Sequence, residues 1–448
     1  MLELLPFGIL ALFIEWCVRG VRRLVRGPRA RAAASDPATR GHGTTRLAWR
    51  QSRWMGACWL ALGLTGLILV RPAIGWWSAD PASGTDPGVR GLDGPLRDEL
   101  VDWARERRPV GLAVGIVADG RVRRATLGHS RLTPGGAPLR EALFEIGSIT
   151  KTFTGILLAR TAGDGLVSLD SRVSDFLPTG IDVAPEQTAI TLQHLATHTA
   201  GLPRLPPGFH LDPSRVFRSW VLGMDPYRNY RTDDLLRAFG AARLNSNPGV
   251  RSEYSNFGFG LLGWALGRAA GDGYAAAVRD LVVQPLGLEG IEMEPSGGTG
   301  VRATGYRARL AVGPVRLGME AQPWELPEAV AGAGALRSTL DGMIRYLTMN
   351  MDARATPLRA AIDLAQREHF RGQSGLAIGL AWIRERRDEL GQTVIWHNGG
   401  TGGFRSFLGF TEDRRFGVVV LSNSSVSVDP LGWRLLEAMA RSSGSGPR

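Results

Sequence analysis

The chain has 448 residues, enough for two or three domains and a large hydrophobic core. Its formal net charge is +11, but residues 19–53 hold ten arginines and one acid, so this segment carries +9 and the rest only +2. A charge confined in this way argues against nucleic acid as a partner of the remaining chain. Both cysteines, Cys17 and Cys58, lie in the first 77 residues, so the rest offers no disulfide, thiol chemistry or cysteine metal site.

Two apolar stretches flank the arginine-rich segment. The first covers about residues 2–18, and the second covers 54–70 and is followed by the pair Trp76–Trp77. About 17 apolar residues is the lower limit for a membrane-spanning helix, and tryptophans often mark the membrane interface. The positive-inside rule then predicts that residues 19–53 are cytoplasmic and that the chain after Trp77 lies outside the cytoplasm.

The first apolar stretch contains Glu3, Pro6 and Glu15, which leaves open whether it spans the membrane or lies in its interface. A cleaved signal peptide is not expected, because the basic residues follow the apolar run instead of preceding it. The predicted organisation is therefore a membrane anchor over residues 1–77, a linker rich in Pro, Gly, Asp and Ser over 78–95, a folded domain over 96–441 and a disordered tail over 442–448.

Strand-like patterns lie at both ends of the folded domain. Near its start, two apolar runs surround the turn Asp119–Gly120. Near its end, QTVIWHN, FRSFLGFT and FGVVVLSNSS predict three strands in succession, and DPLGWRLLEAMAR predicts a closing helix. The middle 200 or so residues show helical patterns and loops rich in Pro and Gly. We therefore predict an α+β fold in which the chain ends form one five-stranded antiparallel sheet, flanked by helices, with the middle as a helical insertion.

The only lysine of the chain is Lys151, three residues after Ser148 in FEIGSITKTFTGILLA; the other 52 basic residues are arginine. Arginine cannot release its proton in a protein, whereas a buried lysine can become a neutral amine and serve as a base. At a helix start, residues three apart share a face, and the helix N-terminus stabilises developing negative charge. The pair is a candidate nucleophile and base, although a helix-start serine followed by a surface lysine would show the same pattern.

Two later motifs also place polar residues where elements end. Tyr254-Ser255-Asn256 follows a Pro-Gly turn and precedes an apolar helix, so Tyr254 lies at a loop-to-helix junction. The segment WHNGGTGGF ends an apolar strand with His397, Asn398, Gly399 and Gly400. Its glycines allow a substrate to approach closely and leave a backbone N–H to face an oxyanion.

Together these motifs resemble those of the serine β-lactamase and penicillin-binding-protein superfamily, in its class C-like branch, over roughly residues 100–440. Seven segments follow one another in the order that the family uses: FEIGSITKTFTGILLA, GLVSLDSRVSDFLP, ITLQHLATHTAGLP, YSNFGFGLLGWAL, VVQPLGLEGI, AGAGALRSTLDGMIRYL and WHNGGTGGFRSFLGF. The resemblance implies the β-lactamase/transpeptidase-like fold and hydrolysis in two steps through an acyl-enzyme.

The resemblance also implies a role for each motif residue. Ser148 would be the nucleophile, Lys151 would take its proton as a neutral amine, and Tyr254 would share this role and pass the proton to the leaving group. Asn256 would bind the amide of the substrate's acyl side chain. Gly399 and Gly400 would bind substrate, with the N–H groups of Ser148 and Gly400 forming the oxyanion hole.

One departure concerns the third motif. Many relatives have Lys-Thr-Gly where this chain has His397-Asn398-Gly399. A lysine there is a permanent cation that recruits a substrate carboxylate, whereas a histidine is mostly neutral at pH 7. The histidine form resembles peptidase- and esterase-like members, so His397 is a further candidate catalytic residue and efficient β-lactam turnover is in doubt.

His194 and His198 raise a metal alternative, because they lie four residues apart. A zinc protease would need Glu at position 195, which is Leu, and no third ligand cluster is evident, so no metal or other cofactor is expected. His198 is expected to support the site through hydrogen bonds. Trp220, Tyr227 and Tyr230 are expected to pack in a core more than to line a cleft.

The expected function is that of a membrane-anchored serine hydrolase that cleaves D-alanyl peptides, or related amides and esters, of the cell envelope. β-Lactam hydrolysis and ester hydrolysis are alternatives, in that order. A further alternative is a catalytically inactive, penicillin-binding-like module that binds ligands in the cleft without hydrolysing them. The expected partners are a small-molecule or peptide acyl substrate and the membrane, and the sequence gives no oligomeric state.

Overall fold

The computed structural model describes residues 74–77 and 89–444, apart from residues 90, 93, 134–135, 210–223, 294–299, 313–314 and 374. The arginine-rich segment, both apolar stretches and Trp220 lie outside these residues. Within the part that is described, no helix combines the length and the apolar character needed to cross a bilayer. The membrane anchor therefore remains a prediction.

An eight-stranded antiparallel sheet forms the centre of the domain, in the order β3-β2-β14-β13-β12-β11-β10-β9. Its strands are β2 Gly111–Ala118, β3 Arg121–Gly128, β9 Phe370–Arg371, β10 Ala377–Ile378, β11 Ile383–Arg387, β12 Gln392–Gly400, β13 Arg405–Thr411 and β14 Phe416–Ser422.

The five predicted strands are adjacent in this sheet, but the prediction of five strands was too low. Strands β9 and β10 have two residues each, and β11 reads IRERR, with charges on both faces. Such edge strands lack the apolar alternation that identifies a half-buried strand, so they gave no strand signal.

The sheet joins the two ends of the domain. Asp119 (φ 47°) and Gly120 (φ 78°) both adopt left-handed backbone angles, as a two-residue hairpin turn requires, and connect β2 to β3. Strand β14 pairs with β2 from Ala118↔Phe416 to Leu112↔Ser422. The prediction that early and late strands share one sheet is therefore confirmed.

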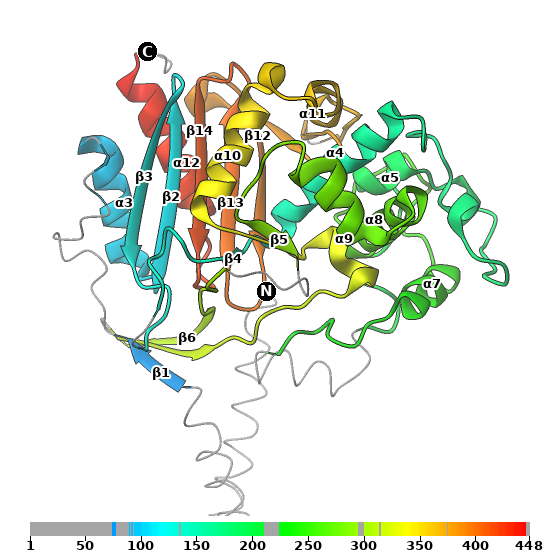
Figure 1. Cartoon of the computed structure of the whole chain (residues 1–448), viewed down its shortest axis with the longest axis horizontal. Helices are drawn as coiled ribbons and strands as arrows, with labels where there is room; N and C mark the ends of the chain where they lie inside the picture. Colours follow the sequence, from blue (N-terminus) through cyan, green and yellow to red (C-terminus); the bar gives the residue numbers. More distant parts are fainter. Residues whose placement is uncertain are drawn as a thin grey trace, which may run out of the picture. The chain divides into compact units, whose positions relative to one another are not determined.

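Helices cover both faces of the sheet. Helices α3 Gly94–Arg107 and α12 Asp429–Ser442 pack on one face, and α10 Leu340–Met351 packs on the other (Figure 1). Alternate residues of β14 face the two layers: Val418 and Val420 pack towards α3 and α12, whereas Val419 and Leu421 belong to the other core. Val89 and Leu92, from the segment predicted as a linker, are buried in the α3–α12 core.

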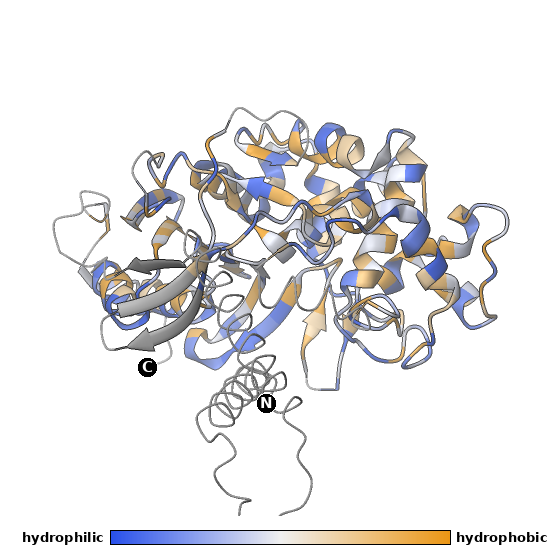
Figure 2. Ribbon diagram, turned by 90° about the horizontal axis from the view of Figure 1, so that it is seen from below, coloured by the Kyte–Doolittle hydropathy of each residue, from blue (hydrophilic) through white to orange (hydrophobic). Residues whose placement is uncertain are grey.

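The remaining helices form the insertion between the first and last strands (Figure 1). In Figure 2 its ribbons carry both apolar and hydrophilic positions, as expected for helices that share a core and face solvent. The helices are α4 Thr150–Gly163, α5 Leu192–Ala196, α7 Thr232–Gly240, α8 Asn256–Ala270, α9 Gly273–Val278 and α11 Arg359–Gln366, with a π-helical turn at Arg279–Val283 and 3₁₀ turns η3 Gly147–Ile149, η4 Val173–Phe176, η5 Gln187–Ala189, η7 Glu328–Ala333, η8 Ala353–Ala355 and η9 Asp388–Leu390.

Two three-stranded sheets complete the described structure. One has the order β4-β8-β5, from Phe144–Glu145, Leu336–Ser338 and Ile291–Met293. The other has the order β1-β7-β6, from Ile74–Trp77, Val315–Glu320 and Tyr306–Val312. Strand β4 leads directly into the turn that carries Ser148, so the first of these sheets helps to position the candidate nucleophile.

Candidate active site

Ser148 lies on the 3₁₀ turn η3, between β4 and helix α4, and is half-buried. The residue before it, Gly147, has φ 52°, and a Cβ there would lie 2.6 Å from the backbone nitrogen of Gly400. Only glycine fits such a left-handed position at such a close approach. This contact brings the serine turn against the end of strand β12.

Ser148 Oγ has two polar neighbours. Tyr254 Oη donates a hydrogen bond to it over 2.7 Å, and Lys151 Nζ lies 3.1 Å from it. Lys151 Nζ also lies 2.9 Å from Asn256 Oδ1 and 2.6 Å from the carbonyl oxygen of Ala333. The predicted nucleophile, base, tyrosine and asparagine therefore form one hydrogen-bonded group.

The environment of Lys151 favours a neutral amine. Its side chain is fully buried, and no carboxylate in the described part of the chain forms an ion pair with it. Burial, together with the positive charge of Arg204, holds the lysine pKa well below its usual range. A neutral amine has two N–H donors and one lone pair. Asn256 Oδ1 and Ala333 O can accept the two N–H groups, which leaves the lone pair for the Ser148 hydroxyl proton.

Tyr254 is held at the start of α8 by its neighbours. Ser255 caps this helix, because its Oγ accepts a hydrogen bond from Gly258 N over 2.9 Å. The backbone N–H of Ser255 donates to His198 Nδ1 over 3.1 Å, and the His198 ring lies 4.5 Å from the Tyr254 ring, centroid to centroid. Burial raises the pKa of Tyr254 to about 12, against opposing effects of Ser148 and Arg204, so the phenol keeps its proton near pH 7.

The two histidines of HLATH make separate contacts. His194 Nδ1 accepts a hydrogen bond from Thr191 N over 3.2 Å, at the start of its own short helix. His198 supports Tyr254 as described above. Across the described residues, no group of three His, Cys, Asp or Glu side chains is arranged to hold a metal ion.

His397 is buried beside the hydrogen-bonded group of Ser148, Lys151, Tyr254 and Asn256. Its Nδ1 lies 2.6 Å from the carbonyl oxygen of Asn398; since a carbonyl only accepts, this nitrogen carries the proton. Burial lowers the His397 pKa to about 3, so the ring is neutral over the ordinary pH range. Its ring centroid lies 6.3 Å from that of Tyr254. His397 therefore does not supply the cation that a lysine would supply at this position.

The end of strand β12 presents an open backbone edge to Ser148. The pairing of β12 with β11 ends at Trp396, whereas its pairing with β13 continues to Gly400. Residues 397–400 thus have β13 on one side and the serine turn on the other. A Cβ at Gly399 would lie 2.0 Å from the Ile146 carbonyl oxygen, so the two segments are in direct contact. This arrangement places the Gly400 backbone beside Ser148, as an oxyanion hole requires.

The structure thus brings all seven candidate residues together: Ser148, Lys151, Tyr254 and Asn256 through hydrogen bonds, and His397, Gly399 and Gly400 through packing. The sequence analysis missed the Ala333 carbonyl, which accepts from Lys151, and Arg204, whose guanidinium lies over the Tyr254 ring. The available signals were a glycine-rich stretch, AGAGALRST, and an arginine directly after HTAGLP.

An acidic and aromatic layer lies next to the catalytic group. Glu145, at the end of β4, accepts a hydrogen bond from Trp324 N over 2.9 Å, and burial raises the pKa of this carboxyl to about 7. The Trp324 ring packs edge-on against Tyr227, with centroids 5.9 Å apart. Tyr227 and Tyr230 are buried, as predicted, but Tyr227 Oη also lies 3.5 Å from Asn256 Nδ2 and so borders the site.

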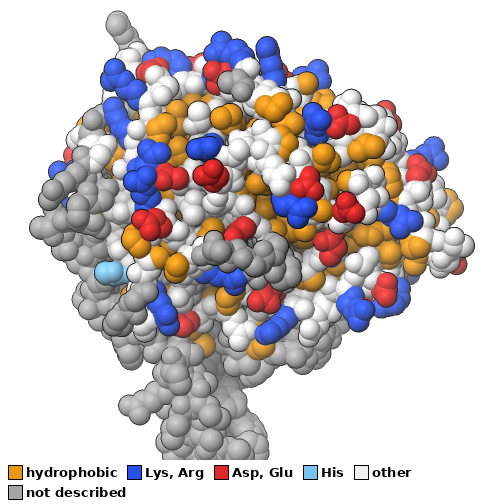
Figure 3. Space-filling model, in the orientation of Figure 1, with side chains coloured by type: hydrophobic (Ala, Val, Ile, Leu, Met, Phe, Trp, Pro, Cys, Tyr) orange, Lys and Arg blue, Asp and Glu red, His pale blue; other side chains and the backbone are white. Residues whose placement is uncertain are grey.

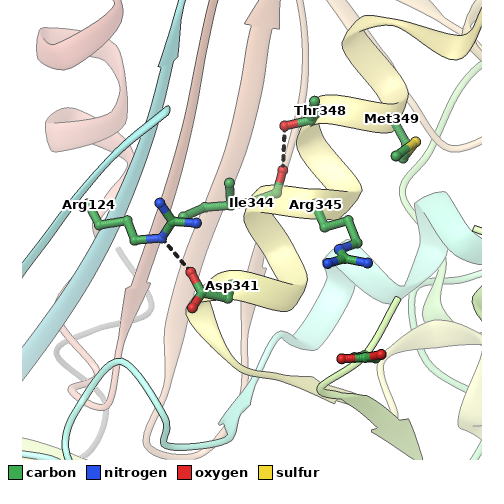
Figure 4. A pocket seen from close by; sticks show the side chains of 7 residues that line it. Arg124, Asp341, Ile344, Arg345, Thr348 and Met349 are labelled. Carbon is green, nitrogen blue, oxygen red and sulfur yellow. Dashed lines mark hydrogen bonds and ion pairs between the residues drawn. The ribbon is translucent and has the colours of Figure 1, made fainter. Parts of the chain in front are cut away.

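A hollow of about 420 Å³ lies between β3 and α10, and none of the candidate residues lines it (Figure 4). Arg124 and Asp341 form an ion pair across it, and Arg345 and Thr348 lie farther along α10. Figure 3 shows cations and carboxylates interspersed on this face of the molecule. The hollow has no nucleophile beside a base, so it offers no comparable chemistry.

Comparisons with known proteins agree with this geometry. The family model described as Beta-lactamase matches residues 96–439. Among curated proteins, D-alanyl-D-alanine-carboxypeptidase/endopeptidase AmpH of Escherichia coli K12 is 29% identical over 330 residues, which cover 70% of this chain and 80% of that protein. A beta-lactamase of the same strain is 26% identical over 368 residues, covering 73% of this chain and 89% of the other. The octameric penicillin-binding protein homologue from Pyrococcus abyssi matches in structure with a TM-score of 0.66 and 24% identity, covering 80% of this chain and 78% of that one.

Proposed function

The chain belongs to the beta-lactamase family and is a serine hydrolase, and we propose that it cleaves D-alanyl peptides, or related amides and esters, of the cell envelope through an acyl-Ser148 intermediate. The observation that carries the proposal is the hydrogen-bonded chain from Tyr254 through Ser148 to a buried Lys151. This chain links an alcohol to an acceptor for its proton.

In the proposed acylation step, Ser148, Lys151 and Tyr254 act in turn. Ser148 Oγ attacks the substrate carbonyl carbon while its proton moves to Lys151 Nζ, and the N–H groups of Ser148 and Gly400 stabilise the oxyanion. When the tetrahedral intermediate collapses, the bond to the leaving group breaks. Tyr254 gives its proton to the leaving group, and the resulting phenolate takes back a proton from the Lys151 ammonium, which restores the phenol and the neutral amine. Water later attacks the acyl-enzyme, and Ser148 recovers its proton as the acid leaves.

One observation supports a peptide substrate over a β-lactam. AmpH, a relative at 29% identity, is named as a D-alanyl-D-alanine carboxypeptidase and endopeptidase. His397 stands where many relatives have a lysine, and its low pKa leaves it neutral. It therefore offers no cation to a substrate carboxylate, and this does not rank the substrates, because D-Ala-D-Ala peptides, penicillins and cephalosporins all carry one.

The test is covalent labelling followed by turnover assays. The purified chain and its Ser148→Ala variant are incubated with a fluorescent penicillin and with a fluorophosphonate. A label on the wild-type protein that the variant loses supports the acyl-enzyme. Absence of label with both probes would instead favour a binding module. Turnover of a D-Ala-D-Ala peptide, nitrocefin and a short-chain ester then ranks the substrates, and preference for nitrocefin would contradict the peptide assignment.

We also propose that the chain is membrane-anchored with its hydrolase domain outside the cytoplasm. The support is the distribution of arginine between the two apolar stretches at 2–18 and 54–70. Protease treatment of intact cells or spheroplasts should digest the hydrolase domain. Digestion only after lysis would refute the orientation.

A further inference from the structure

Arg204 lies beside Tyr254, on the loop that follows HTAGLP. Its backbone is fixed to the start of α8, because its carbonyl oxygen accepts hydrogen bonds from Asn256 N over 3.0 Å and Phe257 N over 3.3 Å. Its side chain is exposed, and its guanidinium carbon lies 4.9 Å from the centroid of the Tyr254 ring. The permanently charged guanidinium of Arg204 therefore lies against the ring of Tyr254, whose hydroxyl contacts Ser148.

Within the part of the chain that the structure describes, no carboxylate balances the charge of Arg204. No carboxylate in the described residues forms an ion pair with it, in contrast to exposed arginines such as Arg251, which pairs with Glu253. The other two basic side chains of the site do not replace it, since burial favours the neutral forms of Lys151 and His397. The positive charge of Arg204 acts on Lys151 and also on Tyr227 and Tyr254.

We propose that Arg204 binds a carboxylate of the substrate beside the scissile bond, and that the enzyme therefore prefers acyl substrates with a negative charge at this point. The guanidinium has a planar set of donors that fits a carboxylate with two parallel hydrogen bonds. It lies next to Tyr254. The inference rests on the proposed hydrolase function, and it specifies that the preferred substrates of that hydrolase carry a negative charge.

A purely structural role for Arg204 predicts a different outcome. If the guanidinium only packs on the Tyr254 ring, its loss would loosen the phenol and slow the hydrolysis of every substrate to the same degree. If Arg204 binds a carboxylate, its loss would raise KM for charged substrates much more than for neutral ones. The ratio of kcat/KM between matched charged and neutral substrates separates the two roles.

The experiment compares the wild-type chain with Arg204→Gln, Arg204→Lys and the control Arg251→Gln, which removes an exposed charge elsewhere. The substrates are two pairs of activated esters: a phenyl ester with and without a carboxylate on the phenol, and a nitrophenyl ester with and without a carboxylate at the end of a short acyl chain. We expect Arg204→Gln to lower kcat/KM for at least one carboxylate ester by roughly 10- to 100-fold more than for its neutral partner. Arg204→Lys should keep part of the preference, and Arg251→Gln should keep all of it.

Three outcomes would overturn the inference in different ways. An equal loss for charged and neutral esters would assign Arg204 to packing. A wild-type ratio in Arg204→Gln would show that no carboxylate binds there. Failure of the wild-type chain to become labelled at Ser148 would remove the hydrolase function itself, and with it the inference. The ester whose kcat/KM falls in Arg204→Gln shows where Arg204 binds the carboxylate: on the leaving group or on the acyl part of the substrate.

Discussion

Replacement of Lys151 by arginine tests the central assignment most directly. The guanidinium could reach the acceptors Asn256 Oδ1 and Ala333 O, but it is permanently protonated and has no lone pair for the Ser148 proton. General-base catalysis contributes about 10²- to 10⁴-fold, so acylation should slow by at least about 10²-fold. The pocket is fully buried, and the larger side chain should also cost about 1–3 kcal/mol of unfolding free energy.

The assay is the rate of fluorophosphonate or penicillin labelling under single-turnover conditions, with thermal unfolding measured on the same samples. A second variant, Lys151→Ala, separates chemistry from folding. It leaves space where the amine stood, so added methylamine should restore part of the labelling, more strongly as pH rises and the free amine accumulates. Labelling of folded Lys151→Arg within tenfold of the wild-type rate would refute the role of Lys151 as a base.

Three further changes follow from the geometry. Gly399→Ala places a Cβ 2.0 Å from the Ile146 carbonyl oxygen, so β12 must move away from Ser148. Acylation should therefore fall by about 10²- to 10³-fold. Gly163→Ala is the matched control and should stay active, because no atom lies within 4 Å of the added Cβ. Tyr254→Phe removes the donor to Ser148 but keeps the ring, so single-turnover acylation should fall about 10²-fold while the melting temperature barely changes; full activity would exclude Tyr254 from proton transfer. Because the folded-state pKa of Glu145 is raised from 4.5 to about 7, the folded protein binds the extra proton between these values and loses stability as pH rises through this window. Denaturant unfolding of wild type and Glu145→Gln should therefore show the wild type losing about 3 kcal/mol relative to the variant between pH 4 and 8, and parallel curves would contradict the buried acid.

The sequence could predict the parts of the fold that local patterns determine. The hairpin at Asp119–Gly120, the three late strands and the helix after Ser148 all have clear periodicity or turn residues. The edge strands β9 to β11 have neither, because they are short or charged on both faces and are held by pairing with neighbours.

The site could be predicted only as far as its motifs reach. The spacing of Ser148 and Lys151 is local, so their contact follows from one helical turn. The Ala333 carbonyl and the position of Arg204 over Tyr254 depend on contacts between distant segments, and no residue pattern records them. The neutral state of His397 also depends on its burial in the folded chain, which its position at a strand end did not specify.

The pairing of β2 with β14 has a consequence for the newly made protein. Ser148, the proposed nucleophile, is synthesised early, whereas the end of β12, which is proposed to hold the oxyanion, is among the last parts to be made. Contacts between such distant segments form slowly and require most of the chain. A growing chain would therefore carry Ser148 without its proposed oxyanion hole, and hydrolysis would begin only once the final strands have paired.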